Sequence, residues 1–226
     1  MQALEILAGV YFFHVHDQAR IATQPEVPIS IYGEQIVKGY RLWDPFRSKL
    51  GAFLLKSYSI GGQDAITAVL DFQSYHKVLY LGAATGTTVS HVSDIVREGL
   101  VYAVEFSPRS MRDLLRLCES RKNVIPLLED AAKPEIYSPI LEPVDLIYQD
   151  VAQRNQAEIV NRNVIRYLKP GGTLVFMVKT RSVDVTQPPR DVYLEEVNRL
   201  EGVEVLKVLD LRPFHKDHWA VVAKKS

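Results

Sequence analysis

The stretch KVLYLGAATGTTVSH, from Lys77 to His91, contains the turn that decides the fold. Val78–Leu81 is a short apolar run typical of a strand, and it leads directly into the small residues Gly82–Gly86. Such a turn lets a ligand approach the main chain at the carboxyl end of the strand, and free amides at the start of the next helix favour an anionic group. The glycine spacing is not G-x-G-x-x-G, so the dinucleotide fingerprint is absent.

Strand and helix patterns alternate outward from this stretch. We expect strands at Val78–Leu81, Val101–Phe106, Val124–Leu128, Val144–Tyr148 and Thr173–Val178. Helices are expected at Thr88–Arg97, Pro108–Ser120, Gln153–Leu168 and Pro189–Leu200, and a weaker helix at Pro134–Ile140. Lys169–Gly172 is expected to be a stop that ends the helix Gln153–Leu168. This alternation predicts an α/β fold in which helices cover both faces of a parallel sheet.

The C-terminal part breaks the alternation. Val203–Leu211 and Trp219–Ala223 are both typical of strands, and only Arg212–His218 lies between them. Because this connection is too short for a crossover helix, the two strands must pair antiparallel. A mostly parallel seven-stranded sheet that ends in an antiparallel hairpin resembles the Rossmann-like fold of S-adenosylmethionine-dependent methyltransferases.

The first 60 residues differ in texture from the rest of the chain. Strand-like runs at Val10–His16, Arg20–Ala22, Ile29–Tyr32 and Gln35–Leu42 predict a small antiparallel β unit. A linking helix is expected to begin with Asp44 as N-cap and Pro45 at its first position, and to end at Gly61-Gly62. We therefore predict a β domain over residues 1–60 and a methyltransferase domain over residues 61–226.

The composition excludes several classes of protein. The chain has 226 residues, 47% of them apolar, and no run of apolar residues that is long enough to span a membrane. One cysteine, Cys118, excludes a disulfide framework and a thiolate-clustered metal site, and no metal is expected. With 27 basic and 27 acidic residues the formal net charge is zero, so a chain that acts on nucleic acid would need partners for much of the electrostatic attraction.

Acidic residues follow three successive strands of the predicted sheet. Glu105 ends the second strand, Asp130-Ala131 follows the third, and Asp150–Gln153 follows the fourth. An acid at the position of Glu105 accepts hydrogen bonds from ribose hydroxyls, and Asp130-Ala131 is placed to meet an adenine amino group. Since all three lie at one edge of the sheet, the sequence predicts a cofactor crevice there.

A second group of residues predicts chemistry at the same edge. Asp150 and Lys179 end neighbouring strands, His218 begins the last strand, and Lys49 lies on the helix after Trp43-Asp44-Pro45. A lysine beside an acid keeps the acid ionised, so that it can orient or deprotonate a hydroxyl. We expect Asp150 to act on the hydroxyl, with Lys49 and Lys179 holding charge and geometry.

These residues resemble those of the fibrillarin family, the methyltransferases of box C/D guide-RNA particles. The similar stretches are Trp43–Leu50 (WDPFRSKL), Tyr80–His91 (YLGAATGTTVSH), Val104–Ser107 (VEFS), Asp150–Gln153 (DVAQ) and Asp217-His218. Gly51 stands where the family often has alanine. The resemblance covers nearly the whole chain and implies 2′-O-methylation of ribose in rRNA, and sometimes tRNA, directed by a guide RNA.

The resemblance also implies site residues and partners. It assigns the catalytic group to Lys49, Asp150, Lys179 and His218. Together with the small-residue turn, it assigns S-adenosylmethionine to Gly82, Ala83, Thr87, Thr88, Glu105, Phe106, Asp130, Ala131, Asp150, Val151, Ala152 and Gln153. A Nop-type scaffold protein and a kink-turn-binding protein of ribosomal type would complete the particle. The lack of a Gly/Arg-rich tail resembles the archaeal form and implies a cytoplasmic location.

Two other functions fit parts of this pattern. A guide-independent methyltransferase that acts on a small molecule or a protein would have the same crevice without needing Lys49 and Lys179 along a phosphate path. A non-catalytic subunit of an RNA particle would need neither lysine, and the intact catalytic group argues against it. A nicotinamide dehydrogenase is disfavoured by the glycine spacing and the terminal hairpin.

Overall fold

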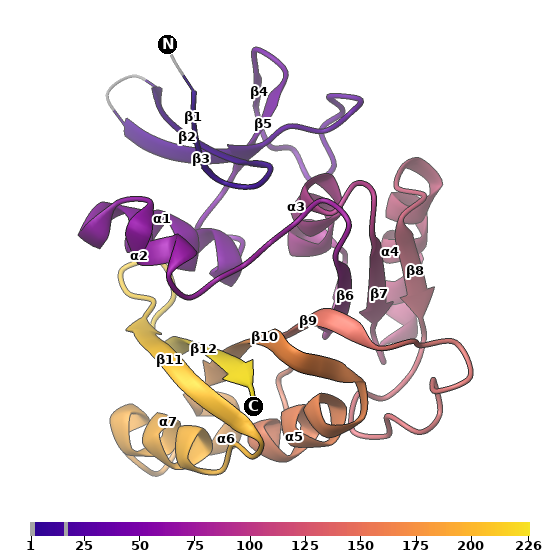
Figure 1. The fold of residues 1–226 in the computed structure, drawn as a ribbon, viewed down its shortest axis with the longest axis vertical. Coiled ribbons are helices and arrows are strands. Elements are labelled where there is room, and N and C mark those ends of the chain that lie inside the picture. Colours follow the sequence, from indigo (N-terminus) through magenta and orange to yellow (C-terminus); the bar gives the residue numbers. More distant parts are fainter. Residues whose placement is uncertain (1–2, 16–17) are drawn as a thin grey trace.

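The computed structural model describes residues 3–15 and 18–226, which form two β-sheets (Figure 1). An N-terminal antiparallel sheet has the strand order β1-β2-β3-β5-β4, and a seven-stranded sheet has the order β11-β12-β10-β9-β6-β7-β8. Strands β6 to β10 pair in parallel, and β12 joins β10 and β11 antiparallel. The predicted methyltransferase-type fold with a terminal hairpin is confirmed.

The elements have the following bounds. The N-terminal region contains β1 (Leu4–Leu7), β2 (Val10–Val15), β3 (Gln18–Thr23), β4 (Ile36–Val37), β5 (Tyr40–Trp43), α1 (Lys49–Gly61) and α2 (Asp64–Thr67). The rest contains β6 (Lys77–Leu81), α3 (Thr87–Ile95), β7 (Leu100–Val104), α4 (Pro108–Ser120), β8 (Val124–Leu127), β9 (Val144–Gln149), α5 (Gln156–Tyr167), β10 (Leu168–Lys179), α6 (Thr180–Val183), α7 (Pro189–Asn198), β11 (Val203–Asp210) and β12 (His218–Lys225).

The N-terminal sheet differs from the prediction in three places. The first strand, β1, was not predicted, and Ile29–Tyr32 is a loop rather than a strand. Gln35–Leu42 is divided into β4 and β5 because Lys38 and Gly39 adopt positive φ angles of 52° and 85°, which form a tight turn. The end of the predicted strand Val10–His16 lies outside the described residues, since β2 is described to Val15.

The linking helix begins later than predicted. Asp44 does not cap it, because its carboxylate accepts a hydrogen bond from the N–H of Phe46 at 2.8 Å and closes a separate turn. Ser48 is the N-cap of α1, and its hydroxyl accepts a hydrogen bond from the N–H of Gly51. The later start makes Lys49 the first residue of the helix.

Two further predictions on the second half of the chain are wrong. Residues 134–140 form turns rather than a helix, and the hydroxyl of Tyr137 in this segment donates a buried hydrogen bond to Asn163 of α5. The stop at Lys169–Gly172 lies inside β10, where the register with β9 shifts. Both differences arise from tertiary contacts, which override local sequence signals.

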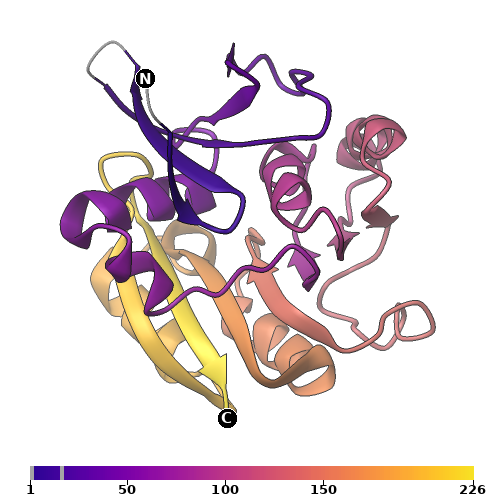
Figure 2. The same cartoon turned by 45° about the horizontal axis from the view of Figure 1, so that its top comes forward.

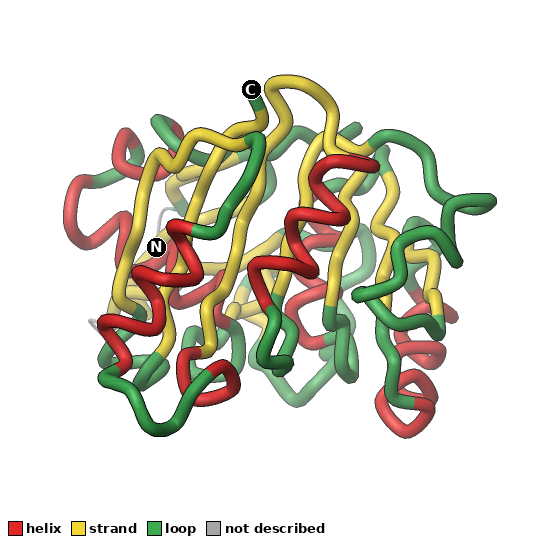
Figure 3. Tube along the Cα trace, turned by 90° about the horizontal axis from the view of Figure 1, so that it is seen from below, coloured by secondary structure: helices red, strands yellow, loops and turns green. Residues whose placement is uncertain are grey.

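The seven-stranded sheet has an apolar core on each face. Alternating strand residues divide between the two cores: Val78 and Tyr80 pack with α1, α3 and α4, whereas Leu79 and Leu81 pack with α5. In Figure 3 the molecule is seen from the side on which α5 and α7 lie, and both helices are in front of the strands. Figures 1 and 2 show α1 between the N-terminal sheet and the β11–β12 hairpin.

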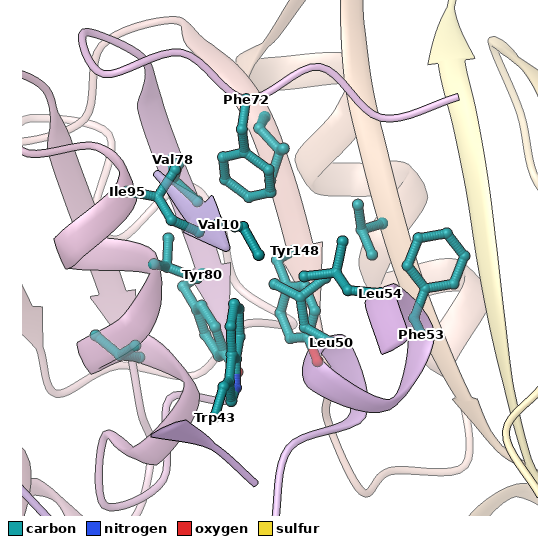
Figure 4. Close-up of a cluster of buried hydrophobic side chains, with 14 of the residues drawn as sticks. Val10, Trp43, Leu50, Phe53, Leu54, Phe72, Val78, Tyr80, Ile95 and Tyr148 are labelled. Atoms are coloured by element: carbon teal, nitrogen blue, oxygen red, sulfur yellow. The ribbon is translucent and has the colours of Figure 1, made fainter. Parts of the chain in front are cut away.

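The first core includes side chains of the N-terminal sheet. Figure 4 shows Val10 of β2 among residues of α1 and the large sheet, such as Leu54 and Tyr148. The N-terminal sheet is therefore packed onto the same core as the large sheet. The division into residues 1–60 and 61–226 stays a prediction.

Within residues 3–15 and 18–226, no helix has the length and apolar character that crossing a membrane requires.

Candidate active site

A pocket of about 230 Å³ lies at the carboxyl ends of β6, β7 and β9. Its lining contains most of the residues that the sequence assigned to a cofactor: Gly82, Glu105, Phe106, Ala131, Asp150, Val151, Ala152 and Gln153. Ala84, Val104, Glu129 and Lys179 complete the lining. The structure therefore has a crevice at the predicted edge of the sheet.

Four of the assigned residues are not in this lining: Ala83, Thr87, Thr88 and Asp130. Ala83 is buried, and the carboxylate of Asp130 accepts a hydrogen bond from the N–H of Ala132 at 3.0 Å. Thr87 lines a neighbouring pocket of about 370 Å³, and the Thr88 hydroxyl is buried against α1. Their roles stay predictions.

The turn after β6 is shaped by one required glycine. Gly82 has a φ of +85°, and a Cβ atom at this position would lie 2.7 Å from the main-chain oxygen of Asp150. The N–H groups of Gly82 and Ala83 both donate to the carbonyl oxygen of Val104 at 3.0 Å, which ties the turn to β7. The turn can therefore approach the end of β9 only because residue 82 lacks a side chain.

Glu105 forms a fixed acceptor in the pocket wall. Its Oε2 accepts a hydrogen bond from the N–H of Ala84 at 2.7 Å, and its Oε1 accepts one from the N–H of Ser107 at 2.8 Å. Each carboxylate oxygen can accept a further hydrogen bond, so the group can still receive ligand hydroxyls. The next residue, Phe106, is 68% exposed and offers a flat apolar surface beside the carboxylate.

Asp150 lies between two lysine side chains. Its Oδ2 accepts a hydrogen bond from Nζ of Lys49 at 3.0 Å, and its Oδ1 lies 2.9 Å from Nζ of Lys179. The ammonium of Lys179 directs its hydrogen bond to the main-chain oxygen of Asp150 at 3.1 Å. Oδ1 is buried beside the ammonium of Lys179, so each oxygen of Asp150 faces one lysine.

The charge state of this carboxylate follows from its neighbours. Burial alone would raise the pKa of Asp150, but the ammonium groups of Lys49 and Lys179 outweigh burial, and the pKa is lowered. Asp150 is therefore ionised at neutral pH. It is suited to accept a hydrogen bond and to hold the two cations, and it is a weak base.

The end of β10 is fixed by Gln156, which the sequence analysis missed. The buried amide of Gln156 accepts a hydrogen bond from the N–H of Lys179 at 2.9 Å and donates one to its carbonyl oxygen at 3.1 Å. This double hydrogen bond continues the edge of the strand and sets where Lys179 leaves it. A glutamine at the start of an amphipathic helix gives no signal of this role in the sequence.

His218 lies beside Lys179, because the two residues are register partners on β12 and β10. Its Nδ1 lies 2.6 Å from the carbonyl oxygen of Lys216, so Nδ1 carries the proton and Nε2 carries the lone pair in the neutral ring. Burial and the charge of Lys49 lower the pKa of His218. The residue before it, Asp217, has a φ of 58° and turns the chain into β12.

The structure therefore gathers Lys49, Asp150, Lys179 and His218 at one rim of the crevice. No cluster of three or more His, Cys, Asp or Glu side chains suited to a metal ion occurs within residues 3–15 and 18–226.

The chain is similar to known proteins over its whole length. The family model described as Fibrillarin matches residues 1–226. A fibrillarin-like rRNA/tRNA 2′-O-methyltransferase of Methanothrix thermoacetophila is 54% identical over 221 residues, which are 98% of each chain.

Solved structures are similar over the same length. A fibrillarin in a fibrillarin/Nop5p complex has a TM-score of 0.87 at 43% sequence identity. The alignment covers 99% of this chain and 100% of that fibrillarin. Aeropyrum pernix fibrillarin with natively bound S-adenosyl-L-methionine has a TM-score of 0.81 at 41% identity, with 98% of this chain covering 99% of that one.

Proposed function

Because the chain belongs to the fibrillarin family, we propose that it methylates the 2′-oxygen of ribose in rRNA and tRNA, with S-adenosylmethionine as methyl donor. The observation that carries this proposal is the carboxylate of Asp150, held between two lysine ammonium groups at the pocket. The similar fibrillarin with natively bound S-adenosyl-L-methionine supports the cofactor, and the names of the relatives support the RNA substrate.

The pocket residues fit this cofactor. Glu105 has free acceptor sites for the two ribose hydroxyls, and the exposed ring of Phe106 offers a surface for adenine. The first N–H groups of α3 have no partner within the helix and suit the carboxylate. The other residues that the sequence assigned to this ligand are proposed contacts as well, with Thr88 contributing its main-chain N–H. When bound, the cofactor supplies a reactive methyl group on a positively charged sulfur.

The charges of Asp150, Lys49 and Lys179 suggest a different role for the carboxylate than for the two ammonium groups. Asp150 fixes the ammonium groups of Lys49 and Lys179 at the pocket, so that they can donate to the 2′-oxygen and orient it. Lys49 and Lys179 keep Asp150 ionised and stabilise the negative charge that develops on that oxygen. Correct positioning of the hydroxyl supplies most of the rate.

The proton of the hydroxyl needs a better base than Asp150, whose pKa is lowered. His218 lies at the same rim, and a neutral imidazole with its lone pair on Nε2 is a common proton acceptor near neutral pH. His218 is therefore the proposed proton acceptor.

The proposal includes partners. A fibrillarin similar to this chain forms a complex with Nop5p, which supports a Nop-type scaffold protein as partner. Box C/D guide RNA and a kink-turn-binding protein of ribosomal type complete the proposed particle. The net charge of zero agrees with this assembly, because binding of the RNA phosphates is then shared with partners. A cytoplasmic location belongs to the same proposal.

Methylation in a reconstituted particle tests this function. The purified chain is incubated with radiolabelled S-adenosylmethionine, target RNA, a box C/D guide RNA, the scaffold protein and the kink-turn-binding protein. We expect label on the 2′-oxygen of the guided nucleotide, and none when the guide is omitted. Equal label without the guide would favour a guide-independent methyltransferase, and no label despite cofactor binding would favour a non-catalytic subunit.

The Gly82→Ala variant is expected to bind S-adenosylmethionine at least about tenfold more weakly. A methyl group would clash with the main chain of Asp150 at 2.7 Å, and the left-handed φ adds strain of about 1–2 kcal/mol. Titration calorimetry measures the affinity. Gly171→Ala is the matched control, because its φ is +70° but nothing lies within 4 Å of the added Cβ. An equal loss of affinity for S-adenosylmethionine in both variants would show that backbone strain, rather than the clash with Asp150, weakens binding.

A further inference from the structure

The first turn of α1, which carries Lys49, is joined to α3 by a buried hydrogen bond. The hydroxyl of Thr88 donates to Oγ of Ser48 at 2.9 Å, and the two residues are 8% and 2% exposed. The same Ser48 oxygen accepts the N–H of Gly51 at 3.2 Å and caps the helix. The next residue after this cap is Lys49, whose ammonium reaches Asp150 at 3.0 Å.

An aromatic stack joins the same two helices. A Cβ atom on Gly51 would lie 3.0 Å from the indole of Trp43, so α1 packs directly on that ring. Figure 4 shows Trp43 beside the start of α1. The indole stacks on the ring of His91 with centroids 4.6 Å apart. His91 lies three residues after Thr88, so both residues lie on one face of α3, and His91 reaches α1 through the Trp43 ring.

Thr88 is also tied to the cofactor turn. It is the second residue of α3, and the N-cap of α3 is Gly86, the last of the small residues after β6. Its side chain does not line the cofactor pocket, and its hydroxyl is already used by Ser48. Thr88 therefore lies between the turn that forms the pocket and the helix that carries Lys49.

From this arrangement we propose that Thr88 is a positioning residue, whose hydroxyl holds Ser48 and thereby places the ammonium of Lys49 against Asp150. The inference rests on the proposed function, which gives Lys49 its catalytic role. The sequence assigned Thr88 to the cofactor, whereas in this role its side chain contacts Ser48. The main-chain N–H of Thr88 remains available to a ligand.

The Thr88→Val variant, which keeps the shape and removes the hydroxyl, separates these two roles. In the reconstituted particle we expect kcat to fall about ten- to a hundredfold, because small displacements of catalytic groups have effects of this size. The dissociation constant for S-adenosylmethionine, measured by calorimetry, should change less than about threefold. Thr88→Ser keeps the hydroxyl and should restore most of kcat.

Two further variants test whether the effect passes through Lys49. In the Lys49→Met background, Thr88→Val should lower kcat no further, because residues that act as a unit are not additive. Ser93→Ala is the matched structural control, since it removes a buried hydroxyl at the other end of α3 that donates to Asn123 at 2.7 Å. Its kcat should stay within about twofold of the unaltered protein.

Crystal structures of the unaltered protein and of Thr88→Val give a readout that needs no activity. We expect the Lys49 ammonium to leave Asp150 in the variant. An unchanged contact between Lys49 and Asp150, or a loss of cofactor affinity without a loss of kcat, would overturn the proposal. If the unaltered particle transfers no methyl group, the proposed function fails, and the position of Lys49 in the two structures still decides this inference.

Discussion

Asp150→Asn is expected to lower kcat for methyl transfer about 1,000-fold, the size of effect seen when one electrostatic contact that stabilises the reacting oxygen is removed. Asparagine has nearly the same shape but no charge, so Lys49 and Lys179 would face each other without a counterion. The two ammonium groups would separate, and the reacting oxygen would lose the charges that orient and stabilise it. Single-turnover methylation in the reconstituted particle measures the effect. A variant that retains more than about a tenth of the rate would contradict the role of Asp150.

Asp145→Asn is the matched control for this variant. Asp145 lies on β9, the strand that Asp150 follows. It pairs with Lys169 at 2.6 Å and accepts the N–H of Lys77 at 2.9 Å, but it does not line the pocket. Its substitution should leave the rate within about twofold.

Stability also depends on the charge of Asp150. Because its pKa is lowered on folding, Asp150 contributes stability above the ordinary carboxyl pKa of about 3.9, and this contribution is lost as the pH falls through the lowered folded value. The stability difference between the unaltered protein and Asp150→Asn should therefore narrow below about pH 4.

The alternating part of the fold was predictable because its signals are local. Pro108–Ser120 has the predicted bounds, since Ser107 caps α4 and Pro108 suits its first turn. The start of α1 was not predictable in the same way, because Asp44 and Ser48 both have side chains that suit an N-cap. The contact of Ser48 with Thr88, far away in the sequence, distinguishes the two.

The site shows the same limit. Glu105, Asp150 and Lys179 follow strands, and the carboxyl ends of parallel strands meet at one edge, so topology alone brings them together. The sequence did not reveal that Gln156 holds the end of β10, because such a role depends on the direction of one side chain. The gathering of these three residues could thus be predicted from the sequence, whereas the side chain that fixes the end of β10 could not.

The largest feature that the sequence analysis missed is a buried ionic cluster around Arg41. Arg41 lies in β5, is 0% exposed, and contacts Glu34 of the preceding loop and Asp94 of α3, the latter at 2.6 Å. Arg121 approaches the other oxygen of Asp94 at 3.1 Å. The cluster links the N-terminal sheet to the helix that begins at the cofactor turn.

The two carboxylates of this cluster respond differently to burial. Burial raises the pKa of Asp94, and Arg41 and Arg121 offset this only in part. Burial acts in the same direction on Glu34, but hydrogen bonds from the N–H groups of Tyr32 and Ile31, together with Arg41, lower its pKa overall. Arg41 therefore favours the ionised form of both carboxylates, together with Arg121 at Asp94 and the two N–H groups at Glu34.

Arg41→Met is expected to destabilise the protein by about 3–5 kcal/mol, because removing one partner leaves the other buried charges uncompensated. A loss of this size lowers the midpoint of thermal unfolding by roughly 10 °C in a chain of this length. Urea denaturation at pH 7 measures the free energy of unfolding. The matched control is Arg116→Met, whose side chain is 76% exposed in its pair with Asp113 and should change stability by less than about 0.5 kcal/mol.

The pH dependence of Arg41→Met distinguishes lost charge compensation from lost packing. Without Arg41, the pKa values of Glu34 and Asp94 should rise in the folded state, so the folded variant binds protons that the unfolded chain releases. A carboxylate with a raised folded pKa stabilises the folded state more at low pH. The difference in free energy of unfolding between the unaltered protein and Arg41→Met should therefore be smaller when urea denaturation is repeated at pH 5. A deficit that stays constant between pH 7 and pH 5 would mean that Arg41 stabilises the junction of the N-terminal sheet with α3 by its volume rather than by its charge.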